Sequence, residues 1–412
     1  MVVEQIKSYL ATVDLPCDLK QLPSCAYLVG GSVRDALLQR YRNPIDLDFV
    51  LPKKAIATAQ QVANFYHGGF VVLDREREIA RVVFPQGTLD LAQQEGASLE
   101  QDLRRRDFTI NAIAYNVQSQ KLIDPLGGLS DLKQGILRMV SSENLEEDPL
   151  RLLRAYRQAA QLDFTIEAET KIAIKERCAL LKTVAAERVQ AELNYIFTAP
   201  QGNKWLISAI EEGLLQFWLP TIDRAKIEQL GTIERGIEFC LKSGVRFSSV
   251  KDTSELTILA KLATLVALEP ATAEAELTQL KYSRAQIKAV TKTVKSLPQL
   301  QQMTEQMNLR EQYFWFLEVK DIFPILIARA IATGVSLAMI IPLVQRYLDP
   351  SDRVAYPQPL VTGNDLIREL NLKPSPLIGK LLTEIQIAHI ESKISTPQQA
   401  IEFAGSVLRS IE

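Results

Sequence analysis

The alternation of apolar and polar residues divides the chain into a first third of mixed character and a helical remainder. Short apolar runs bounded by Gly, Pro or polar residues predict strands at residues 26–30, 45–52, 70–74, 79–84 and 88–92. Residues 32–41 and 55–67 instead repeat their apolar side chains at helical spacing. Because the strand-like runs lie too close together for βαβ crossovers, we expect a small mixed or antiparallel sheet.

After residue 141 the spacing of apolar residues becomes helical almost throughout. It predicts helices at residues 150–161, 167–181 and 185–197, and further helices interrupted at Pro200, Pro220, Pro270, Pro298 and residues 349–359. The most apolar run, residues 330–344, is shorter than the roughly 20 residues of a membrane span, so it predicts a buried core helix. The expected fold class is therefore α+β, a small mixed sheet followed by an all-α remainder, with no membrane segment.

Composition and charge are those of a globular protein. The 412 residues are 47% hydrophobic and 23% charged, with a formal net charge of −2, so any nucleic-acid surface must be local. The few cysteines and histidines lack the spacing of a zinc site, and free thiols favour a reducing, cytoplasmic compartment. These residues are Cys17, Cys25, Cys178, Cys240, His67 and His389. The charged N-terminal segment does not resemble a signal peptide.

A pair of glycines stands between the first predicted strand and the helix that follows it. Gly30 and Gly31 permit a tight turn and a close approach of the backbone to a phosphate group. Arg34, one turn into the helix, adds a guanidinium that can bind the same phosphates. A plain turn explains the two glycines equally well, so this motif alone does not decide between the two interpretations.

Three acidic residues alternate with apolar residues on predicted strands. Asp46 and Asp48 are two positions apart, so their carboxylates share one face of the strand, and Asp90 follows the same pattern in a later strand. Like charges that lie close together repel, and a divalent cation such as Mg²⁺ relieves the repulsion when phosphate oxygens complete its coordination. The alternative is a set of solvated aspartates at the edge of a sheet.

Two arginine-rich segments complete the candidate chemistry. Residues 104–106 are consecutive arginines in front of Asp107 and an apolar segment, so at least one guanidinium should point inward, toward Asp107 or a ligand phosphate. Residues 148–157 read DPLRLLRAYR, with Asp148 predicted as the N-cap and Pro149 in the first turn of a helix. The spacing also allows Asp148 to pair with Arg151. A capped helix with a solvated basic stripe is the alternative.

Taken together, GGSVRD, DLDFV, RRRDFTINA and EEDPLRLLRAYR resemble the motifs of the class II tRNA nucleotidyltransferases and their bacterial poly(A) polymerase relatives. The order and spacing of the motifs agree over residues 25–200, and AAERVQAEL at residues 185–193 resembles a fifth motif. The segment LVTGNDLIRELNLKPSPLIGKLL is similar to the tRNA-binding end of these enzymes. The resemblance implies a nucleotidyltransferase head (1–139), a helical neck (140–200), a helical body (201–348) and a helical, tRNA-binding tail (349–412).

The resemblance also implies a role for each motif residue. The 3′-hydroxyl of tRNA would attack the α-phosphate of CTP, and possibly of ATP, and pyrophosphate would leave. The triphosphate would be bound by Gly30, Gly31 and Arg34, Mg²⁺ by Asp46 and Asp48, with Asp90 as the third carboxylate. Phosphate and ribose would contact Arg106, Asp107 and Asn111, and the base would be read by Asp148 and Arg151 with support from Arg154 and Arg157.

One departure from the family pattern bears on which nucleotides are added. Only LAQQEGASLEQ separates Asp90 from Asp102, whereas complete CCA-adding members carry a longer flexible loop there. In the family this loop is linked to the switch from C to A, and members without it resemble enzymes that add CC only. We therefore expect a CC-adding enzyme. Full CCA addition, an A-adding enzyme, a poly(A) polymerase and an inactive RNA-binding relative are the alternatives.

Overall fold

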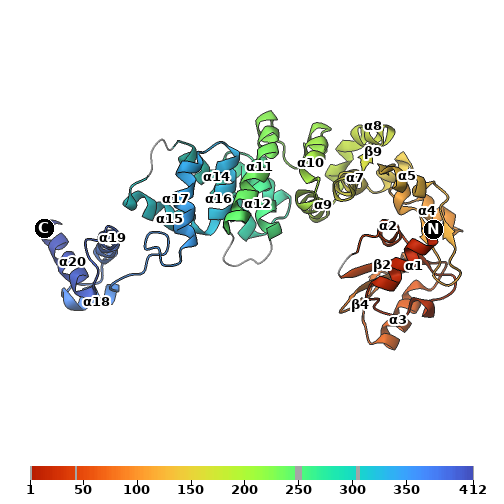
Figure 1. The fold of residues 1–412 in the computed structure, drawn as a ribbon, viewed down its shortest axis with the longest axis horizontal. Helices are drawn as coiled ribbons and strands as arrows, with labels where there is room; N and C mark the ends of the chain where they lie inside the picture. Colours follow the sequence, from red (N-terminus) through yellow and green to blue (C-terminus); the bar gives the residue numbers. More distant parts are fainter. Residues whose placement is uncertain (1, 42–43, 246–252, 303–306, 412) are drawn as a thin grey trace. The chain divides into compact units, whose positions relative to one another are not determined.

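The computed structural model describes residues 2–41, 44–245, 253–302 and 307–411 (Figure 1). The chain forms two compact units, Met1–Phe217 and Trp218–Glu412, and each is described by itself. The first unit contains the predicted head and neck. The finer division into head, neck, body and tail stays a prediction.

The main sheet in the described part of the first unit has seven strands in the order β3-β4-β5-β2-β1-β6-β7. β2 and β5 pair in parallel and every other neighbouring pair is antiparallel, so the predicted small mixed sheet is confirmed. The strands are β1 (Tyr27–Val29), β2 (Ile45–Leu51), β3 (Gly69–Asp74), β4 (Ile79–Phe84), β5 (Gly87–Gln93), β6 (Ala114–Tyr115) and β7 (Leu122–Ile123). The first five match the predicted strands closely. β6 and β7 were not predicted, because two residues show no periodicity.

The helices of the first unit cover the sheet and continue the chain beyond it. They are α1 (Val2–Thr12), α2 (Gly31–Leu37), α3 (Ala55–Tyr66), α4 (Leu99–Arg104), α5 (Gly128–Gln134), α6 (Ser142–Glu147), α7 (Leu150–Leu162), α8 (Ala168–Arg177), α9 (Ala186–Thr198) and α10 (Gly202–Glu211). The predicted helices at 150–161 and 185–197 are confirmed by α7 and α9. α8 ends earlier than predicted, because residues 178–183 tighten into a 3₁₀ helix.

A second, two-stranded sheet interrupts the helices of the first unit. β8 (Ile136–Leu137) pairs in parallel with β9 (Thr165–Ile166). α7 ends where Asp163 adopts a left-handed conformation with φ of 58°. The extended residues that follow then bond to the backbone of Gly135. The predicted helical neck therefore contains one short strand.

The two faces of the main sheet differ in character, and this difference positions the acidic residues. Leu47, Leu89 and Val82 are register partners on adjacent strands and are fully or almost fully buried, on the face against which α3 packs. Because side chains alternate along a strand, Asp48 and Asp90 lie on the opposite face. The sequence alternation of Asp and Leu thus separates a core face from a polar face.

Among its described residues, the second unit contains helices joined by turns and irregular segments, and no strand. Its helices are α11 (Arg224–Ser243), α12 (Thr253–Leu265), α13 (Pro270–Gln279), α14 (Arg284–Gln302), α15 (Leu309–Val319), α16 (Phe323–Ala332), α17 (Leu337–Leu348), α18 (Gly363–Glu369), α19 (Pro376–Ile390) and α20 (Pro397–Ile411). α11 and α16 cross closely at Gly236, where an added Cβ would lie 2.1 Å from the carbonyl oxygen of Ala328. A larger residue there would force the two helices apart.

Two predictions about this unit are wrong. The apolar run 330–344 is not one helix but the end of α16 and the start of α17. Gly334, with φ of 87°, closes the first helix, and the Ser336 side chain caps the second. Pro298 does not break α14, which continues to Gln302. The buried side chains of Leu297 and Leu300 on either side of Pro298 anchor this part of the helix despite the lost backbone donor.

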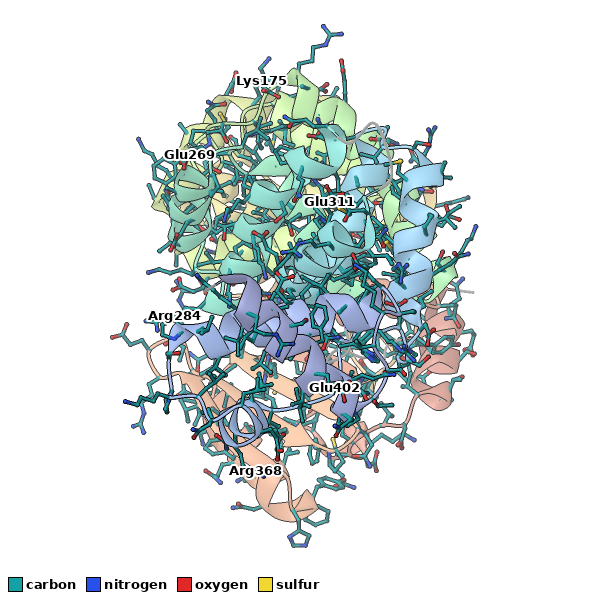
Figure 2. All side chains as sticks on the ribbon, turned by 90° about the vertical axis from the view of Figure 1, so that its left-hand side faces the viewer. Lys175, Glu269, Arg284, Glu311, Arg368 and Glu402 are labelled. Carbon is teal, nitrogen blue, oxygen red and sulfur yellow. The ribbon has the colours of Figure 1, made fainter. Side chains whose placement is uncertain are left out.

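Charged side chains project outward from both units, as Lys175 and Arg284 do in Figure 2. Among the described residues, the helices are all too short or too polar to cross a membrane.

Candidate active site

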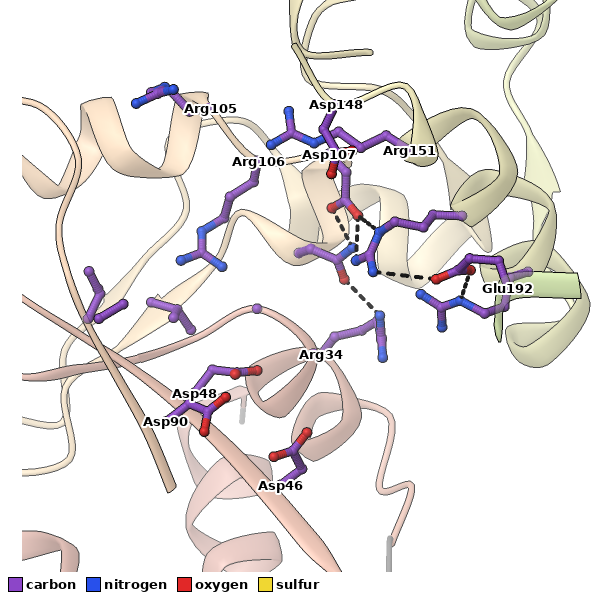
Figure 3. Close-up of a pocket in the computed structure, with 18 of the residues that line it drawn as sticks. Arg34, Asp46, Asp48, Asp90, Arg105, Arg106, Asp107, Asp148, Arg151 and Glu192 are labelled. Carbon is purple, nitrogen blue, oxygen red and sulfur yellow. Dashed lines mark hydrogen bonds and ion pairs between the residues drawn. The ribbon is translucent and has the colours of Figure 1, made fainter. Parts of the chain in front are cut away.

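A cleft of about 1410 Å³ opens in the first unit between the polar face of the sheet and helices α7 and α9. It brings together all of the predicted site residues (Figure 3). Its lining includes Gly30, Gly31, Arg34, Asp46, Asp48, Asp90, Arg106, Asp107, Asn111, Asp148, Arg151, Arg154 and Arg157. Residues separated by more than a hundred positions in the sequence thus line one cleft.

Gly30 forms the turn between β1 and α2 and requires glycine for two reasons. Its φ of 69° lies in the left-handed region that other residues rarely adopt. An added Cβ would also lie 3.0 Å from Nη1 of Arg106 and 3.8 Å from Oδ2 of Asp48. The turn therefore leaves space for a guanidinium and a carboxylate to approach the backbone.

Ser32, in the first turn of α2, fixes the strand that carries the acidic pair. Its hydroxyl donates to the carbonyl oxygen of Asp46 at 3.1 Å and accepts from the backbone N–H of Asp48 at 3.0 Å. Sequence reasoning missed this residue, because a serine after a glycine pair is a common turn residue. Through Ser32, the helix after the glycines and the strand of the carboxylates become one rigid piece.

The acidic residues lie in adjacent rows of the sheet. Asp48 is the register partner of Asp90, and Asp46 is the partner of Thr88, whose hydroxyl donates to Oδ1 of Asp46. Burial, together with the negative charges of Asp46 and Asp90, raises the pKa of Asp48 to about 6. The pKa of Asp48 thus reports crowded negative charge, which a divalent cation would neutralise. Asp46 and Asp48 fit such a cation as a two-carboxylate site.

Asp90 does not join the acidic pair as a free third carboxylate. Nε of Arg81 donates to Oδ1 of Asp90 at 2.7 Å, and Nη2 donates to Oδ2 at 2.8 Å. Within the part of the chain that the structure describes, no three acidic, histidine or cysteine side chains are arranged to hold one metal ion. The register agrees with the expected position of the three acids on one face of the sheet, and Asp90 is held there by Arg81. The signal missed in the sequence was Arg81, which faces Asp90 across an antiparallel pair.

Of the consecutive arginines, Arg106 points into the cleft. The side chains of Arg104 and Arg105 are 53% and 47% exposed, and that of Arg106 is 25% exposed. Arg106 pairs with Asp102 at 3.1 Å and not with Asp107, so of the two expected partners, Asp107 or a ligand phosphate, the first is not observed. The four-residue spacing on α4 makes Asp102 the nearer partner. Nε of Arg106 is buried, and within the described parts of the chain it has no hydrogen-bond partner.

A buried polar network joins the sheet to helix α7. Oδ1 of Asp107 accepts from Asn111 at 2.8 Å, and Oδ2 accepts from Nε and Nη2 of Arg154 at 3.0 and 2.8 Å. Nη1 of Arg34 donates to Oδ1 of Asn111 at 2.7 Å and to Oε1 of Gln158 at 2.9 Å. Gln158 was missed, although its position four residues after Arg154 places both on one side of the helix. Arg34 is thus held within this network at the wall of the cleft.

The network fixes the charge of Asp107. Burial alone would raise its pKa, but Arg154 and the donors Asn111 and Phe108 N–H hold the pKa of Asp107 well below its usual range. Asp107 is therefore an anion that orients Arg154. Arg157 is oriented in a similar way by Glu192 of α9 and by Gln161. Glu192 lies in AAERVQAEL, so the motif was noticed although this residue was not singled out.

The predicted pair of Asp148 and Arg151 is not formed. Asp148 follows α6 in an extended conformation, and its Oδ1 accepts from the backbone N–H of Leu150, the first residue of α7, at 3.4 Å. Its Oδ2 pairs with Arg188 of α9 at 3.0 Å. Arg151 donates to the carbonyl oxygen of Asn144 at 2.8 Å. Pro149 occupies the N-cap position of α7. Only the pairing with Arg151 was wrong, because local spacing could not show that α9 brings Arg188 to the same carboxylate.

The connection between β5 and α4 is short and held in place. Residues 94–98 join the two elements, and Gly96 turns the chain with φ of 86°. The backbone N–H of Glu95 donates to Oδ1 of Asp102 at 3.0 Å, and the Glu95 side chain pairs with Arg105. This segment contains no long arginine-rich loop, as the sequence indicated.

Three family models match parts of the chain. The Poly A polymerase head domain matches residues 26–138, the probable RNA and SrmB-binding site of polymerase A matches residues 163–226, and the putative tRNA nucleotidyltransferase domain 2 matches residues 251–404. The chain is 48% identical to a CC-adding tRNA nucleotidyltransferase of Synechocystis sp., over 98% of this chain and 99% of that protein. It is 31% identical to an A-adding tRNA nucleotidyltransferase of Deinococcus radiodurans, over 93% and 96% of the two chains.

The fold also agrees with that of a solved structure. The CCA-adding enzyme of Thermotoga maritima, complexed with tRNA, superposes with a TM-score of 0.75 over 99% of this chain and 98% of that chain, at 23% identity. Together with the sequence matches, this likeness confirms the α+β fold class and defines the protein as an enzyme that transfers nucleotides. The chain belongs to the family of tRNA nucleotidyltransferases and poly(A) polymerases, which confirms the resemblance of its motifs.

Proposed function

We propose that the protein is a CC-adding tRNA nucleotidyltransferase, which adds two cytidines from CTP to a tRNA that lacks its CCA end and releases pyrophosphate. The observation that carries the CC-adding assignment is the five-residue connection 94–98 between β5 and α4. The 48% identity to a CC-adding enzyme over nearly the whole chain supports the same assignment.

The short connection supports CC addition for a physical reason. A loop that helps the site change from CTP to ATP must be long enough to move and to contact the nucleotide. Residues 94–98 are instead tied to α4 through Glu95 and Asp102, and Gln101 accepts from the backbone N–H of Ala97 at 2.6 Å. A segment with its polar groups engaged in this way has little freedom to act as a lever.

Asp46 and Asp48 are the proposed ligands of Mg²⁺. Carboxylate oxygens are hard ligands, and two of them leave coordination positions for the phosphate oxygens of a nucleotide. When bound, the ion would neutralise charge on the triphosphate and on the leaving pyrophosphate. The role of the chain is to present both carboxylates on one rigid strand, which Ser32 holds at the backbone of both residues.

Gly30, Gly31 and Arg106 are proposed to contact the triphosphate. Gly30 keeps the backbone open beside Asp48, and the buried Nε of Arg106 has no hydrogen-bond partner among the residues that the structure describes. Phosphate oxygens are suitable acceptors for such a guanidinium. Arg34, Asp107 and Asn111 are joined in the buried network. We propose that this network shapes the wall of the cleft against which the nucleotide binds.

Asp148 and Arg151 are proposed to read the base. The carboxylate accepts from an exocyclic amine and the guanidinium donates to ring acceptors, a combination that selects C or A over U or G. Oδ2 of Asp148 is paired with Arg188, and the remaining lone pairs of the carboxylate can accept from the base. Arg154 and Arg157, held by Asp107 and Glu192, support the reading helix.

The second unit is proposed to bind the duplex part of tRNA through its backbone and shape. We also propose a cytoplasmic location. The cysteines among the described residues are free thiols, and thiols stay reduced in the cytoplasm.

Nucleotide addition to a tRNA transcript without CCA tests the proposal. The purified full chain is incubated with Mg²⁺ and with CTP, ATP or both, and the products are resolved at single-nucleotide resolution. Two cytidines and then a stop, with ATP present, support the proposal. A third residue, adenosine, would instead indicate CCA addition. Growth with ATP alone would indicate an A-adding enzyme or a poly(A) polymerase.

The variant Asp46→Asn/Asp48→Asn serves as the control and should add nothing. If this variant is as active as the wild type, the metal assignment is wrong. If neither protein adds a nucleotide, the reading of the chain as an inactive RNA-binding relative is favoured.

A further inference from the structure

A row of side chains crosses four adjacent strands on the polar face of the sheet. The register pairs Val71 of β3 with Arg81 of β4, Arg81 with Asp90 of β5, and Asp90 with Asp48 of β2. Arg81 therefore stands on the outer side of Asp90, while the metal-binding pair stands on its inner side.

Arg81 engages Asp90 with both arms of its guanidinium. The two parallel bonds, of 2.7 and 2.8 Å, occupy one lone pair on each carboxylate oxygen. The Asp90 side chain is 17% exposed and that of Arg81 is 38% exposed. The guanidinium is thus reachable from solvent, whereas the carboxylate is largely covered. A positive charge beside Asp90 also disfavours a cation at the same carboxylate.

The sheet beyond Arg81 is open. Val71 is 48% exposed and Val83, two residues after Arg81 on the same face, is 42% exposed. The exposed Arg77, at the turn before β4, lines the cleft. Two exposed valines beside Arg81, with Arg77 nearby on the lining of the cleft, offer apolar and basic contacts that fit the sugar and phosphate of an RNA end.

We propose that Arg81 is a positioning residue that holds Asp90 away from the metal site until a phosphate of the RNA forms an ion pair with the Arg81 guanidinium. The proposal rests on the proposed function, since it requires an RNA end at the site. In the free protein, Arg81 is the counterion of Asp90. When the terminal phosphodiester of the RNA pairs with Arg81, Asp90 turns to the site formed by Asp46 and Asp48 and completes it with a third carboxylate.

A purely structural role for the ion pair makes a different prediction. If Arg81 only stabilises the sheet, its removal lowers stability and does not create a stronger metal site. If Arg81 instead keeps Asp90 from the metal site, its removal gives a protein that binds a divalent cation more tightly in the absence of RNA. The direction of the change in metal affinity therefore separates the two roles.

The test is a titration with Mn²⁺ alone, followed by electron paramagnetic resonance, on the full chain without nucleotide or RNA. Arg81→Gln should bind Mn²⁺ about tenfold more tightly than the wild type, because a third carboxylate becomes available. Arg75→Gln, which removes the same charge from an exposed position in the turn before β4, is the matched control and should change the affinity less than about twofold. Arg81→Gln/Asp90→Asn should lose the gain.

A gain no larger than that of the control, or a gain that persists in the double variant, overturns the proposal. Circular dichroism and thermal melting establish that each variant is folded. If Arg81→Gln does not fold, Arg81→Lys replaces it. Lysine keeps the charge but cannot form two parallel bonds, so a smaller gain that Asp90→Asn removes is expected.

The RNA half of the proposal is tested by the salt dependence of binding to a tRNA that lacks CCA. Arg81→Gln should reduce the slope of log affinity against log salt by about one, the value for one lost phosphate contact. An unchanged slope overturns this half. The Mn²⁺ titration uses neither nucleotide nor RNA, so its outcome is independent of whether the protein adds CC, CCA or A.

Discussion

Replacing Asp107 by Asn tests whether the buried network holds helix α7 against the sheet. The carboxylate accepts on Oδ1 from the backbone N–H of Phe108 and from Asn111, both at 2.8 Å. On Oδ2 it accepts from Arg154, at 3.0 and 2.8 Å, and from Gln158 at 3.3 Å. An asparagine keeps an oxygen for the first pair of donors but turns a neutral amide toward the arginine.

The loss can be estimated from the burial of the two partners. Removing one member of a buried ion pair costs about 3–5 kcal/mol, because the other charge is left without compensation. The Asp107 side chain is 7% exposed, but that of Arg154 is 35% exposed and can recover water. We therefore expect a loss of about 3 kcal/mol in the free energy of opening, the lower end of that range.

Hydrogen–deuterium exchange of peptides from α7, in the full chain, measures this loss without assuming that the whole chain unfolds in one step. About 3 kcal/mol corresponds to exchange roughly a hundredfold faster. Asp14→Asn, at an exposed position in the same unit, is the control and should change the exchange rate by less than about threefold. If Asp107→Asn behaves like this control, the network does not hold α7 in the way described.

The same variant has a pH signature. Because the pKa of Asp107 is depressed below the ordinary value of 3.8, its ionised form stabilises the fold at neutral pH. This contribution is lost as the pH falls below that ordinary value toward the lower pKa of the folded state. Exchange of α7 in the wild type should therefore accelerate with acid more steeply than in Asp107→Asn. Equal acid dependence in the two proteins would contradict the assignment.

Three further predictions concern the carboxylate strand and its turn. Because the pKa of Asp48 is raised to about 6, protons compete with the metal ion for this carboxylate below that pH. The affinity for Mn²⁺, measured by titration, should therefore fall steeply between pH 7 and pH 5. An affinity that does not change with pH would argue against Asp48 as a ligand. Gly30→Ala places a Cβ 3.0 Å from Nη1 of Arg106 at a residue whose φ is 69°. It should lower the free energy of unfolding by about 1–2 kcal/mol and lower kcat for C addition. A wild-type kcat would contradict the proposed role of the turn. Ser32→Ala removes two hydrogen bonds and should lower the free energy of unfolding, measured in urea, by about 1–2 kcal/mol. It should also reduce kcat more than it raises KM for CTP. A change in KM alone would mean that Ser32 does not position the carboxylates.

The sequence predicted the elements that have strong periodicity and the residues that have chemical motifs. The alternation of acidic and apolar residues in β2 and β5 placed Asp48 and Asp90 on one face, and the register confirms it. The inward arginine of residues 104–106 and the short connection after β5 were also predicted correctly. In each case the pattern is local, so neighbouring residues contain the information.

Partner choice could not be predicted in the same way. Asp90 pairs with Arg81, Asp148 with Arg188, and Asp107 with Arg154, and the members of these pairs are 9, 40 and 47 positions apart. Nothing in local spacing distinguishes these arginines from others nearby. The pairs depend on which strands and helices become neighbours, which tertiary packing decides. For the same reason Pro298 was predicted to break a helix that its buried neighbours keep intact.

The mass of the tRNA product tests the central claim most directly. A tRNA transcript without CCA is incubated with the full chain, Mg²⁺, CTP and ATP until no further change occurs, and its intact mass is measured. The account predicts a gain equal to two cytidylates and no more, even with ATP in excess. A gain of two cytidylates and one adenylate would contradict CC addition, and no gain would contradict nucleotide transfer itself.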